Sequence, residues 1–588
     1  RAWRQYCGSI EAPANPRADN VLFVPVCRQV PKIRIATKRA SDYVNMRIQV
    51  EIDMWESNCK YPQGHYLKTL GPVGDIEVES TVILLENDIC IRPFPPKVLR
   101  CLPQVGPNGE WDPTEQDCRG RVDFRNGGYR VFSVDPPGCK DIDDALHVRH
   151  LGNGKTEVGV HIADVTHFVA PGNACDEEAR FRGTSVYLVQ RRIDMLPSLL
   201  TTDLCSLVGN KERLAFSCVW VLDQDANILD VRFHKSVIKS VAAMTYGKAQ
   251  EMIDDEKDDS DLAKDLRAMM KVSKRLKQRR EEMGALSLAS NEVRFELDSV
   301  THDPIDAVEY QMKETNSMVE EMMLLANCSV AKKISEAYPS CAMLRRHDAP
   351  PPANFEPLKK VAKSLGFDLD CSTNKALASS LDTVHVDGRP MVNRLVRILA
   401  TRSMTQAQYF ASGDVSSSSD CLHYGLAAPL YTHFTSPIRR YADVIVHRLL
   451  AACLGIFPLP DELASTVGVS TIAKGINVRH RQAQFAGRQS TDLHAFVYFK
   501  NKDVVVEDAY VMRCRKNGVV CLVPKYGIEV PVYLTNANQE GGYKLEDDGM
   551  CLRSAARTIR MLDKLRVEIR LEDLAAHRHR LKCALADS

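Results

Sequence analysis

Four aspartates lie within ten consecutive positions of the chain, in a run that apolar residues flank on both sides. Because like charges this close repel one another, converging carboxylates are costly to keep ionised unless cations lie between them. Ligand sets made only of oxygen atoms favour Mg²⁺ or Mn²⁺ over zinc. The pattern therefore predicts a two-ion site for phosphoester hydrolysis, where one ion activates water and the other stabilises the departing 3′ oxygen of a nucleic acid. The predicted metal ligands are Asp135, Asp141, Asp143 and Asp144.

The simplest alternative for such a run is a solvated acidic turn. Against it, Asp135 follows the apolar run 131–134 and precedes Pro136-Pro137-Gly138. This is a rigid turn that sends the chain back past its own carboxylate. A calcium-binding EF-hand loop is excluded, because the Gly and the final Glu that such a loop requires are absent from their positions.

A second charged motif, residues 435–440, predicts the start of a helix with Ser436 as the N-cap. The free amides of a helix start attract an anion, so Arg439 and Arg440 in that turn are expected to contact a phosphate. Asp443 follows Arg439 by four residues and shares its helix face. We expect Asp443 to hold the Arg439 guanidinium in its fork geometry, and an ordinary surface salt bridge is the alternative.

The chain has 588 residues, which is long enough for roughly three to five domains. Strand-like runs dominate residues 1–100, including 76–86, and dominate residues 501–588 again. Residues 101–130 are rich in Pro and Gly and are interpreted as a linker. Residues 131–500 mix strands with long amphipathic helices, so the predicted architecture is multidomain α+β: a small barrel, a large mixed α/β body and a second small barrel. The helices expected in the body are 262–283, 314–336, 392–412 and 438–454.

The overall composition limits how the chain could bind nucleic acid. Its net charge is only +1, from 77 basic and 76 acidic residues, so no long-range positive field covers the whole surface and any nucleic-acid site must be local. The 19 cysteines include no Cys-x-x-Cys pair, which favours free thiols in a reducing compartment. No apolar run approaches the length that a membrane helix needs, so no membrane association is expected.

The aspartate run and further motifs along nearly the whole chain resemble the RNase II and RNase R superfamily, whose central unit is the RNB catalytic domain. Within it, the run 134–139 is most similar to the catalytic subunits of eukaryotic RNA exosomes. Those proteins begin with a PIN endonuclease domain and a first cold-shock barrel, for which there is no room before Arg1, so we expect this chain to lack both. The motifs that carry the resemblance are 135–144, 157–165, 182–188, 195–197, 319–322, 344–347 and 431–441.

The resemblance implies four regions. They are an OB-fold cold-shock barrel (1–100), a linker (101–130), an RNB catalytic domain (131–500) and a C-terminal S1 OB-fold barrel (501–588). It also implies a processive, hydrolytic 3′ to 5′ exoribonuclease that degrades single-stranded RNA to nucleoside 5′-monophosphates, with two Mg²⁺ or Mn²⁺ ions. The implied partners are single-stranded RNA and the exosome core subunits, in RNA processing and decay. The implied location is the nucleus, with the nucleolus, and the cytoplasm.

The same resemblance assigns roles to individual side chains. The implied catalytic residues are Asp143, Asp144 and Arg439, and Arg439 is expected to contact the scissile phosphate. Aromatic rings can grip bases of any sequence, although lone tyrosines are more often core residues. A carboxylate on helix 314–336 is expected to accept from a ribose 2′-hydroxyl, and of the neighbouring Glu320 and Glu321 we favour Glu321. The implied RNA-binding residues are Tyr187, Tyr246, Glu321, Arg439 and Arg440.

Two other functions remain open on the sequence. One is a catalytically silent RNA-binding regulator on the same fold, which loss of an aspartate would favour, and all four aspartates are present. The other is the exosome-independent cytoplasmic paralogue that acts on 3′-uridylated RNA. This paralogue naturally lacks a PIN domain, so the N-terminus of the chain does not discriminate between the two exonucleases.

Overall fold

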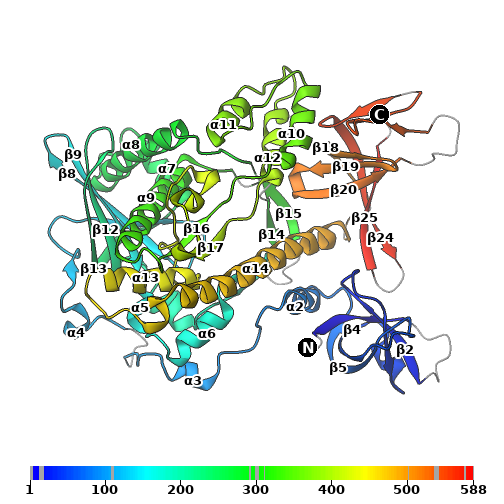
Figure 1. The fold of residues 1–588 in the computed structure, drawn as a ribbon, viewed down its shortest axis with the longest axis horizontal. Coiled ribbons are helices and arrows are strands. Elements are labelled where there is room, and N and C mark those ends of the chain that lie inside the picture. Colours follow the sequence, from blue (N-terminus) through cyan, green and yellow to red (C-terminus); the bar gives the residue numbers. More distant parts are fainter. Residues whose placement is uncertain are drawn as a thin grey trace.

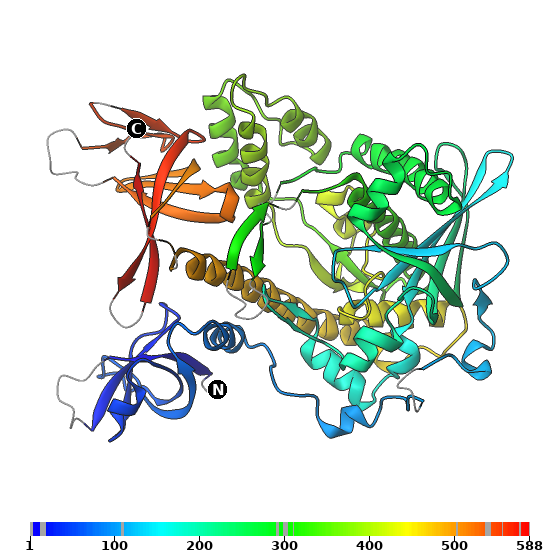
Figure 2. The ribbon, with the colours of Figure 1, turned by 180° about the vertical axis from the view of Figure 1, so that it is seen from behind.

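Two small barrels lie at the same end of a larger α/β body (Figures 1 and 2). The order along the chain is barrel, body, barrel, as the sequence predicts. The computed structural model describes residues 4–11, 19–106, 111–289, 293–297, 304–309, 311–500, 502, 504–534, 542–555, 557–574 and 578–586.

The N-terminal barrel closes through five strands in the order β1-β2-β3-β5-β4. A closed barrel leaves no strand edge open to other chains, and its interior is filled by side chains such as Phe23, Ile33 and Val50, all buried. A short helix, α1 (Ala40–Tyr43), precedes β4. The strands are β1 (Gln5–Ile10), β2 (Asn20–Pro25), β3 (Ile33–Ala36), β4 (Met46–Met54) and β5 (Gln63–Pro72).

The prediction of a strand at 76–86 is wrong, because this segment forms the helix α2 (Ile76–Glu86). The side chain of Asp75 accepts hydrogen bonds from the amides of Glu77 and Val78 and so caps the helix. Glu77 and Glu79 also place negative charge in the first turn, where the helix dipole favours it. These local signals outweigh the β-branched residues of the segment.

Part of the predicted linker belongs to the body. β6 (Val122–Asp123) pairs in parallel with β13, so the central sheet already includes residues that the sequence analysis assigned to 101–130. A single-turn helix, α3 (Pro96–Leu99), precedes the predicted linker, and a second one, α4 (Glu115–Cys118), lies within it. Residues 107–110 of the predicted linker lie outside the described residues.

The body is built on a six-stranded sheet in the order β12-β9-β8-β7-β13-β6, with β12 and β13 also paired to each other. β7 runs parallel to β13, and the register sets Thr245 opposite Asp135 at the ends of these two strands. The sheet therefore places the first aspartate of the cluster at the carboxyl end of two neighbouring parallel strands. Its other strands are β7 (Val131–Asp135), β8 (Asp144–Gly152), β9 (Lys155–Ala163), β12 (Glu212–Leu222) and β13 (Ile228–Thr245).

Helices and short hairpins make up the rest of the body. The helices are α5 (Val165–Phe168), α6 (Ala174–Arg182), α7 (Tyr246–Asp254), α8 (Asp261–Glu282), α9 (Glu314–Ala337), α10 (Pro352–Ser364), α11 (Asn374–Asp382), α12 (Met391–Ser403), α13 (Tyr441–Cys453) and α14 (Thr466–Lys500), with a π-helical segment at Leu199–Leu204. The hairpins are β10 (Val186–Tyr187) with β11 (Arg192–Ile193), β14 (Val293–Leu297) with β15 (Pro304–Glu309), and β16 (Met343–Arg346) with β17 (Gln408–Ala411). Of these elements, α10, α11 and α12 pack toward the C-terminal barrel rather than onto this sheet (Figure 1).

The four helices expected in the body all exist, and two of them were drawn too long. α8 and α9 match the predicted 262–283 and 314–336 within one residue at each end. The predicted 392–412 breaks into α12 and β17, because β17 pairs with β16. In place of the predicted helix 438–454, α13 begins only at Tyr441, because residues 436–440 form a turn that belongs to the candidate site. The longest helix, α14, was missed; it runs from the body to the barrels (Figures 1 and 2).

The C-terminal barrel closes in the order β18-β19-β20-β25-β24. In the sequence, a separate three-stranded sheet, β21-β22-β23, lies between β20 and β24. Within the described residues, no helix is both long enough and apolar enough to cross a membrane. The strands are β18 (Val505–Arg515), β19 (Gly518–Val523), β20 (Ile528–Tyr533), β21 (Lys544–Leu545), β22 (Cys551–Arg553), β23 (Thr558–Arg560), β24 (Lys564–Leu574) and β25 (Arg578–Leu585).

Candidate active site

The segment from the end of β7 to the start of β8 carries all four aspartates, with Asp135 as the last residue of β7 and Asp144 as the first of β8. The body holds the backbone of the loop between them at several points. Gly138 adopts a positive φ of 78°, which lets the chain turn back. The Ile142 amide donates to Ser206 Oγ at 3.0 Å, and that hydroxyl donates to the carbonyl of Lys140 at 2.8 Å. The carbonyl of Asp143 accepts from the amide of Ala163, at the end of β9. The loop is thus fixed before any ligand arrives.

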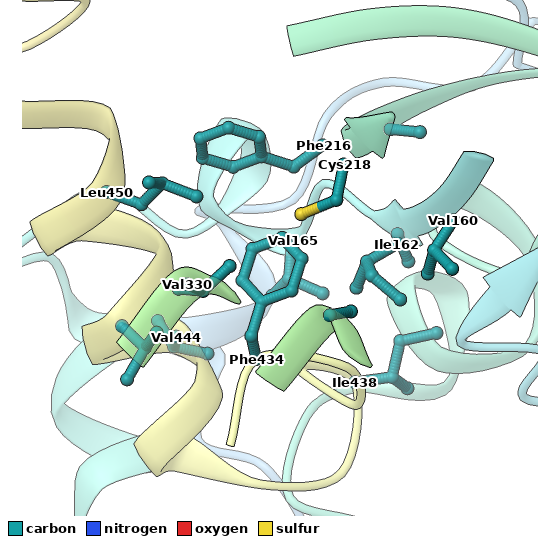
Figure 3. Packing of buried hydrophobic residues seen from close by; sticks show 14 of the residues in the cluster. Val160, Ile162, Val165, Phe216, Cys218, Val330, Phe434, Ile438, Val444 and Leu450 are labelled. Carbon is teal, nitrogen blue, oxygen red and sulfur yellow. The ribbon is translucent and has the colours of Figure 1, made fainter. Parts of the chain in front are cut away.

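Asp143 is the central carboxylate, with only 4% of its surface exposed. Its Oδ1 accepts from the Ile438 amide at 3.0 Å, and its Oδ2 accepts from Arg439 Nε at 3.2 Å. Burial raises the pKa of Asp143 to about 7, although the Arg439 charge and the Ile438 amide act in the opposite direction. Phe434 and Ile438 anchor this partner segment by packing into the apolar core around Val160 (Figure 3).

Two other aspartates also resist ionisation. Burial raises the pKa of Asp135 to about 6, with a further contribution from the charge of Asp141. Burial likewise raises the pKa of Asp144 well above its usual value, and the charges of Asp135 and Asp143 raise it further. The three carboxylates therefore form one electrostatically unfavourable group.

Asp141 has a different environment, because it already has cationic and hydrogen-bonding partners. The hydroxyl of Tyr187 donates to its Oδ2 at 3.0 Å, and Arg192 forms an ion pair with its Oδ1. Tyr187 and Arg192 are cross-strand partners in the β10–β11 hairpin, so one hairpin supplies both contacts. Sequence reasoning missed Arg192; a hairpin turn across Leu188–Arg191 would have placed it opposite Tyr187.

The donor set fits a divalent cation. Asp135 Oδ2 is buried and has no hydrogen-bond partner among the described residues, which is costly for a carboxylate oxygen unless a cation satisfies it. The ligand atoms of the aspartates are not drawn as tightly together as those of Glu546, Asp548 and Cys551, which lie within 4.8 Å of one another. That trio lies at the C-terminal sheet, and it is the one such group among the described residues.

The raised pKa values predict that, without metal, the free energy of unfolding falls as the pH rises, and that a divalent cation counteracts this fall. In the unfolded chain these carboxyls lose their protons near pH 4, whereas Asp135 and Asp143 hold them to about pH 6 and about pH 7. The folded state therefore binds more protons in this window, and the free energy of unfolding should fall as the pH rises through it. A divalent cation should offset this loss once the carboxylates are ionised.

Melting temperatures measured with Mg²⁺ and with EDTA between pH 5 and pH 8 test this expectation. The stabilisation by Mg²⁺ should be large at pH 8 and nearly absent at pH 5, and it should shrink in Asp143→Asn. An equal Mg²⁺ effect at both pH values would contradict the assignment of these carboxylates as metal ligands.

The prediction that Asp443 holds Arg439 is wrong, because Asp443 binds Arg440 instead, through two hydrogen bonds of 2.8 Å. Asp443 Oδ1 also accepts from the Ser436 amide, which closes 436–440 into a turn. The carbonyl of Arg439 accepts from the Ser185 amide, and this contact keeps the backbone extended there. The helix consequently begins at Tyr441, and Arg439 is free to reach Asp143 and Ser436 Oγ.

The remaining candidates divide between the site and its surroundings. Tyr246 directly follows Thr245, the strand partner of Asp135, so it lies beside the cluster, where it is half-buried. Tyr187 is 47% exposed and carries its ring at the surface of the site. Glu321 is buried and paired with Arg280 at 2.6 Å, which commits its carboxylate within the protein. Glu321 and Arg280 line a cavity, and the neighbouring Glu320 is exposed, so the choice of Glu321 for the 2′-hydroxyl contact stays a prediction.

Comparison with known proteins places this site in a family. A family model described as the RNB domain matches residues 121–456, which is more than half of the chain. The chain belongs to the RNB family. Models described as Dis3-like cold-shock domain 2 and as S1 domain match residues 20–88 and 505–583. The family and the fold class expected from the sequence are therefore confirmed.

Among RNB proteins, the chain is similar to two kinds of exonuclease. It is 48% identical over 588 residues to the exosome complex exonuclease RRP44 of Mus musculus, and the match covers 100% of this chain and 60% of that relative. It is 36% identical over 537 residues to DIS3-like exonuclease 2 of Xenopus tropicalis, covering 87% of this chain and 64% of the relative. The chain thus spans about 60% of the length of the RRP44 protein that it matches.

Solved RNB structures share the fold at low identity. The apo form of Mycoplasma genitalium RNase R matches with a TM-score of 0.85 at 22% identity, over 100% of this chain and 90% of that chain. Yeast Ssd1, described as a pseudonuclease, matches with a TM-score of 0.77 at 20% identity, over 99% and 83%. Since a pseudonuclease has this fold too, activity must be argued from the site.

Proposed function

We propose that this RNB protein is a divalent-metal-dependent, hydrolytic 3′ to 5′ exoribonuclease that releases nucleoside 5′-monophosphates from single-stranded RNA. The observation that carries the proposal is the arrangement around Asp143. There a buried carboxylate with a raised pKa and two further carboxylates of the same kind lie within one short segment, and the half-exposed Arg439 guanidinium reaches this segment from another part of the chain. Buried carboxyls whose pKa values are raised by burial and by one another are typical of functional sites.

The chain's own residues account for positioning. Asp135, Asp143 and Asp144, with Asp141, would hold Mg²⁺ or Mn²⁺, and bound ions would supply activated water and neutralise charge on the leaving oxygen. Asp143 orients Arg439 through Nε and Ser436 fixes Nη2, so the guanidinium faces the site in a defined plane. A guanidinium held in this way stabilises the charge that develops on a phosphate in the transition state.

A labelled-RNA assay tests the proposal. A linear single strand carrying a 5′ label should shorten stepwise in the presence of Mg²⁺, and chromatography should identify 5′-mononucleotides as the released product. The same sequence closed into a circle should persist, because it has no 3′ end. Binding without any shortening would instead identify a catalytically silent RNA-binding protein.

The Tyr187 hydroxyl and ring are predicted to have separable effects. Tyr187→Ala removes a stacking platform worth about 1 to 3 kcal/mol per base, so the enzyme should release its substrate earlier and leave a longer limit fragment. Tyr187→Phe keeps the ring and loses only the hydrogen bond to Asp141, so the limit fragment should match that of the wild type. A single-turnover ladder on a uniform oligonucleotide measures both.

Tyr246→Ala is expected to lengthen the limit fragment in the same way. Its melting temperature must be compared with that of the wild type, because Tyr246 also packs against the main core. If neither alanine variant changes the length of the fragment, the two rings do not stack on RNA.

We also propose exosome core subunits as partners and the nucleus, nucleolus and cytoplasm as the location. The higher identity to RRP44 than to DIS3-like exonuclease 2 supports the exosome-associated role over the exosome-independent action on 3′-uridylated RNA. Co-purification of the chain with core subunits tests this. Free chain that prefers a 3′ uridine tail would support the other paralogue.

A further inference from the structure

Arg345, on β16, is a buried charge without an anionic partner. Only 9% of the residue is exposed, and its Nη1 is buried with no hydrogen-bond partner. Across the part of the chain that the structure describes, the guanidinium forms neither an ion pair nor a hydrogen bond. Its side chain lies over the ring of Tyr409, with Cζ 4.7 Å from the ring centre. Because arginine stays charged at any physiological pH, this burial is unfavourable unless an anion binds there.

The groups around Arg345 are neutral or positive. Tyr409 is its cross-strand partner and shares a hydrogen bond of 2.5 Å with His433 Nδ1. Arg440 adds a second guanidinium near the same rings, and its partner Asp443 is already fully used by Arg440 and the Ser436 amide. No carboxylate in this group is therefore left to neutralise Arg345.

Two imidazoles, of His433 and His480, lie close enough to these arginines for the positive charges to lower their pKa values. Burial lowers the pKa of His480 to about 4, and the charges of Arg345 and Arg440 lower it further. The pKa of His433 is also far below its usual value, because of burial and then the charges of Arg440 and Arg345, with Arg439 contributing as well. Both imidazoles are thus neutral at pH 7, and one of them lies within the electrostatic reach of Arg439.

We propose that Arg345 binds a phosphate of the RNA strand other than the scissile phosphate that Arg439 contacts. The proposal rests on the proposed function, in that the anion is a phosphodiester of a strand held in the same site. The Tyr409 ring fixes the plane of the guanidinium, and a planar fork suits two phosphate oxygens. When the Tyr409 hydroxyl donates to His433 Nδ1, the imidazole carries its proton on Nε2, where it can donate to the same phosphate.

Binding measurements in EDTA test this inference without requiring hydrolysis. The oligonucleotides are single-stranded RNAs that carry one neutral methylphosphonate, moved stepwise from the 3′ end. Arg345→Met keeps an unbranched apolar stem and removes the charge. We expect it to bind all-phosphate RNA roughly 10- to 100-fold more weakly and to lower the slope of log K against log salt by about 0.7. At one position the methylphosphonate should weaken the wild type and leave Arg345→Met unchanged.

Arg346→Met is the matched control. Arg346 neighbours Arg345 on β16, points to the opposite side of the strand, and already has Asp348 as a partner at 3.5 Å. It should follow the wild type at every methylphosphonate position. If Arg345→Met does not fold, as judged by its melting curve, Arg345→Lys takes its place. The lysine keeps the charge but lacks the planar fork. At the position where the methylphosphonate weakens binding by the wild type, it should weaken binding by Arg345→Lys less.

Three results would overturn the inference. Arg345→Met, or Arg345→Lys in its place, could remain as sensitive as the wild type at every position, which would mean that other groups hold the phosphates. The variant could lose affinity equally for all oligonucleotides with no position singled out, which would indicate a purely structural role. The variant could bind every oligonucleotide as the wild type does and differ only in how well adenosine 5′-monophosphate competes with the RNA. That result would assign the site to the released product. A chain without nuclease activity would still give a readable scan, so failure here differs from failure of the proposed function.

Discussion

Asp143→Asn should reduce RNA hydrolysis by at least about 1,000-fold while leaving the affinity for single-stranded RNA nearly unchanged. The asparagine keeps an oxygen that can accept from the Ile438 amide, so the loop should retain its position. It loses the negative charge that a metal ligand requires and the acceptor that orients Arg439. A 1,000-fold loss corresponds to about 4 kcal/mol of transition-state stabilisation.

Single-turnover rates with saturating Mg²⁺, together with binding isotherms in EDTA, measure the two halves of this expectation. Asp265→Asn is the matched control, since Asp265 is a buried aspartate on α8 that pairs with Arg130 outside the cluster. It should hydrolyse RNA at the wild-type rate. Turnover of Asp143→Asn within about tenfold of the wild type would refute the metal assignment.

Arg439→Ala should slow every hydrolytic step by about 100- to 1,000-fold, because removing one preorganised donor to a developing charge has a cost of this size. The side chain is 41% exposed, and its partner Asp143 keeps the Ile438 amide and, with a pKa of about 7, can take up a proton. The loss of Arg439 should therefore lower the melting temperature less than the loss of Arg440. Arg439→Lys should recover only part of the rate, since an ammonium lacks the fork that Asp143 and Ser436 orient. Single-turnover ladders should show uniform slowing without a longer limit fragment.

The adjacent Arg440→Ala gives the contrasting result. It leaves Asp443, a fully buried carboxylate, without its cation, so the free energy of unfolding should fall by about 3 kcal/mol. Thermal melts of the two variants distinguish them. A destabilised Arg439→Ala with an unaffected Arg440→Ala would reverse the roles assigned to the two arginines.

The clustering of the four aspartates could be predicted from the sequence because they lie within ten consecutive positions of the chain. Their spacing, with the apolar run and the Pro-Pro-Gly turn beside Asp135, predicts a metal site. The partner of Arg439 could not be predicted in the same way. Asp143 and Arg439 are 296 residues apart, whereas Asp443 is four residues away and satisfies a simple helical rule. The structure shows that a turn at 436–440 breaks that helix before the rule applies.

The prediction of secondary structure failed at 76–86, where two local signals favour different structures. The β-branched residues of 76–86 favour a strand, and the capping Asp75 with its two following glutamates favours the helix that forms. α14 was missed for another reason. Its buried residues cluster in its first turns, as at Ile472, and in its last turns, as at Phe499, with few between 477 and 485. No single apolar stripe runs along it, so helical periodicity is weak over its length.

α14 also sets how the parts of the molecule can move. Its 35 residues span about 50 Å without a break. Ile472 lies in the core of the body, Phe499 lies in the core of the C-terminal barrel, and Gln489 accepts from Asn87, just after α2. A continuous helix has no hinge, so the body and the C-terminal barrel form one mechanical unit. Their mutual orientation is counted in helical turns: each residue inserted in the exposed middle would rotate the C-terminal barrel by about 100° and shift it by about 1.5 Å.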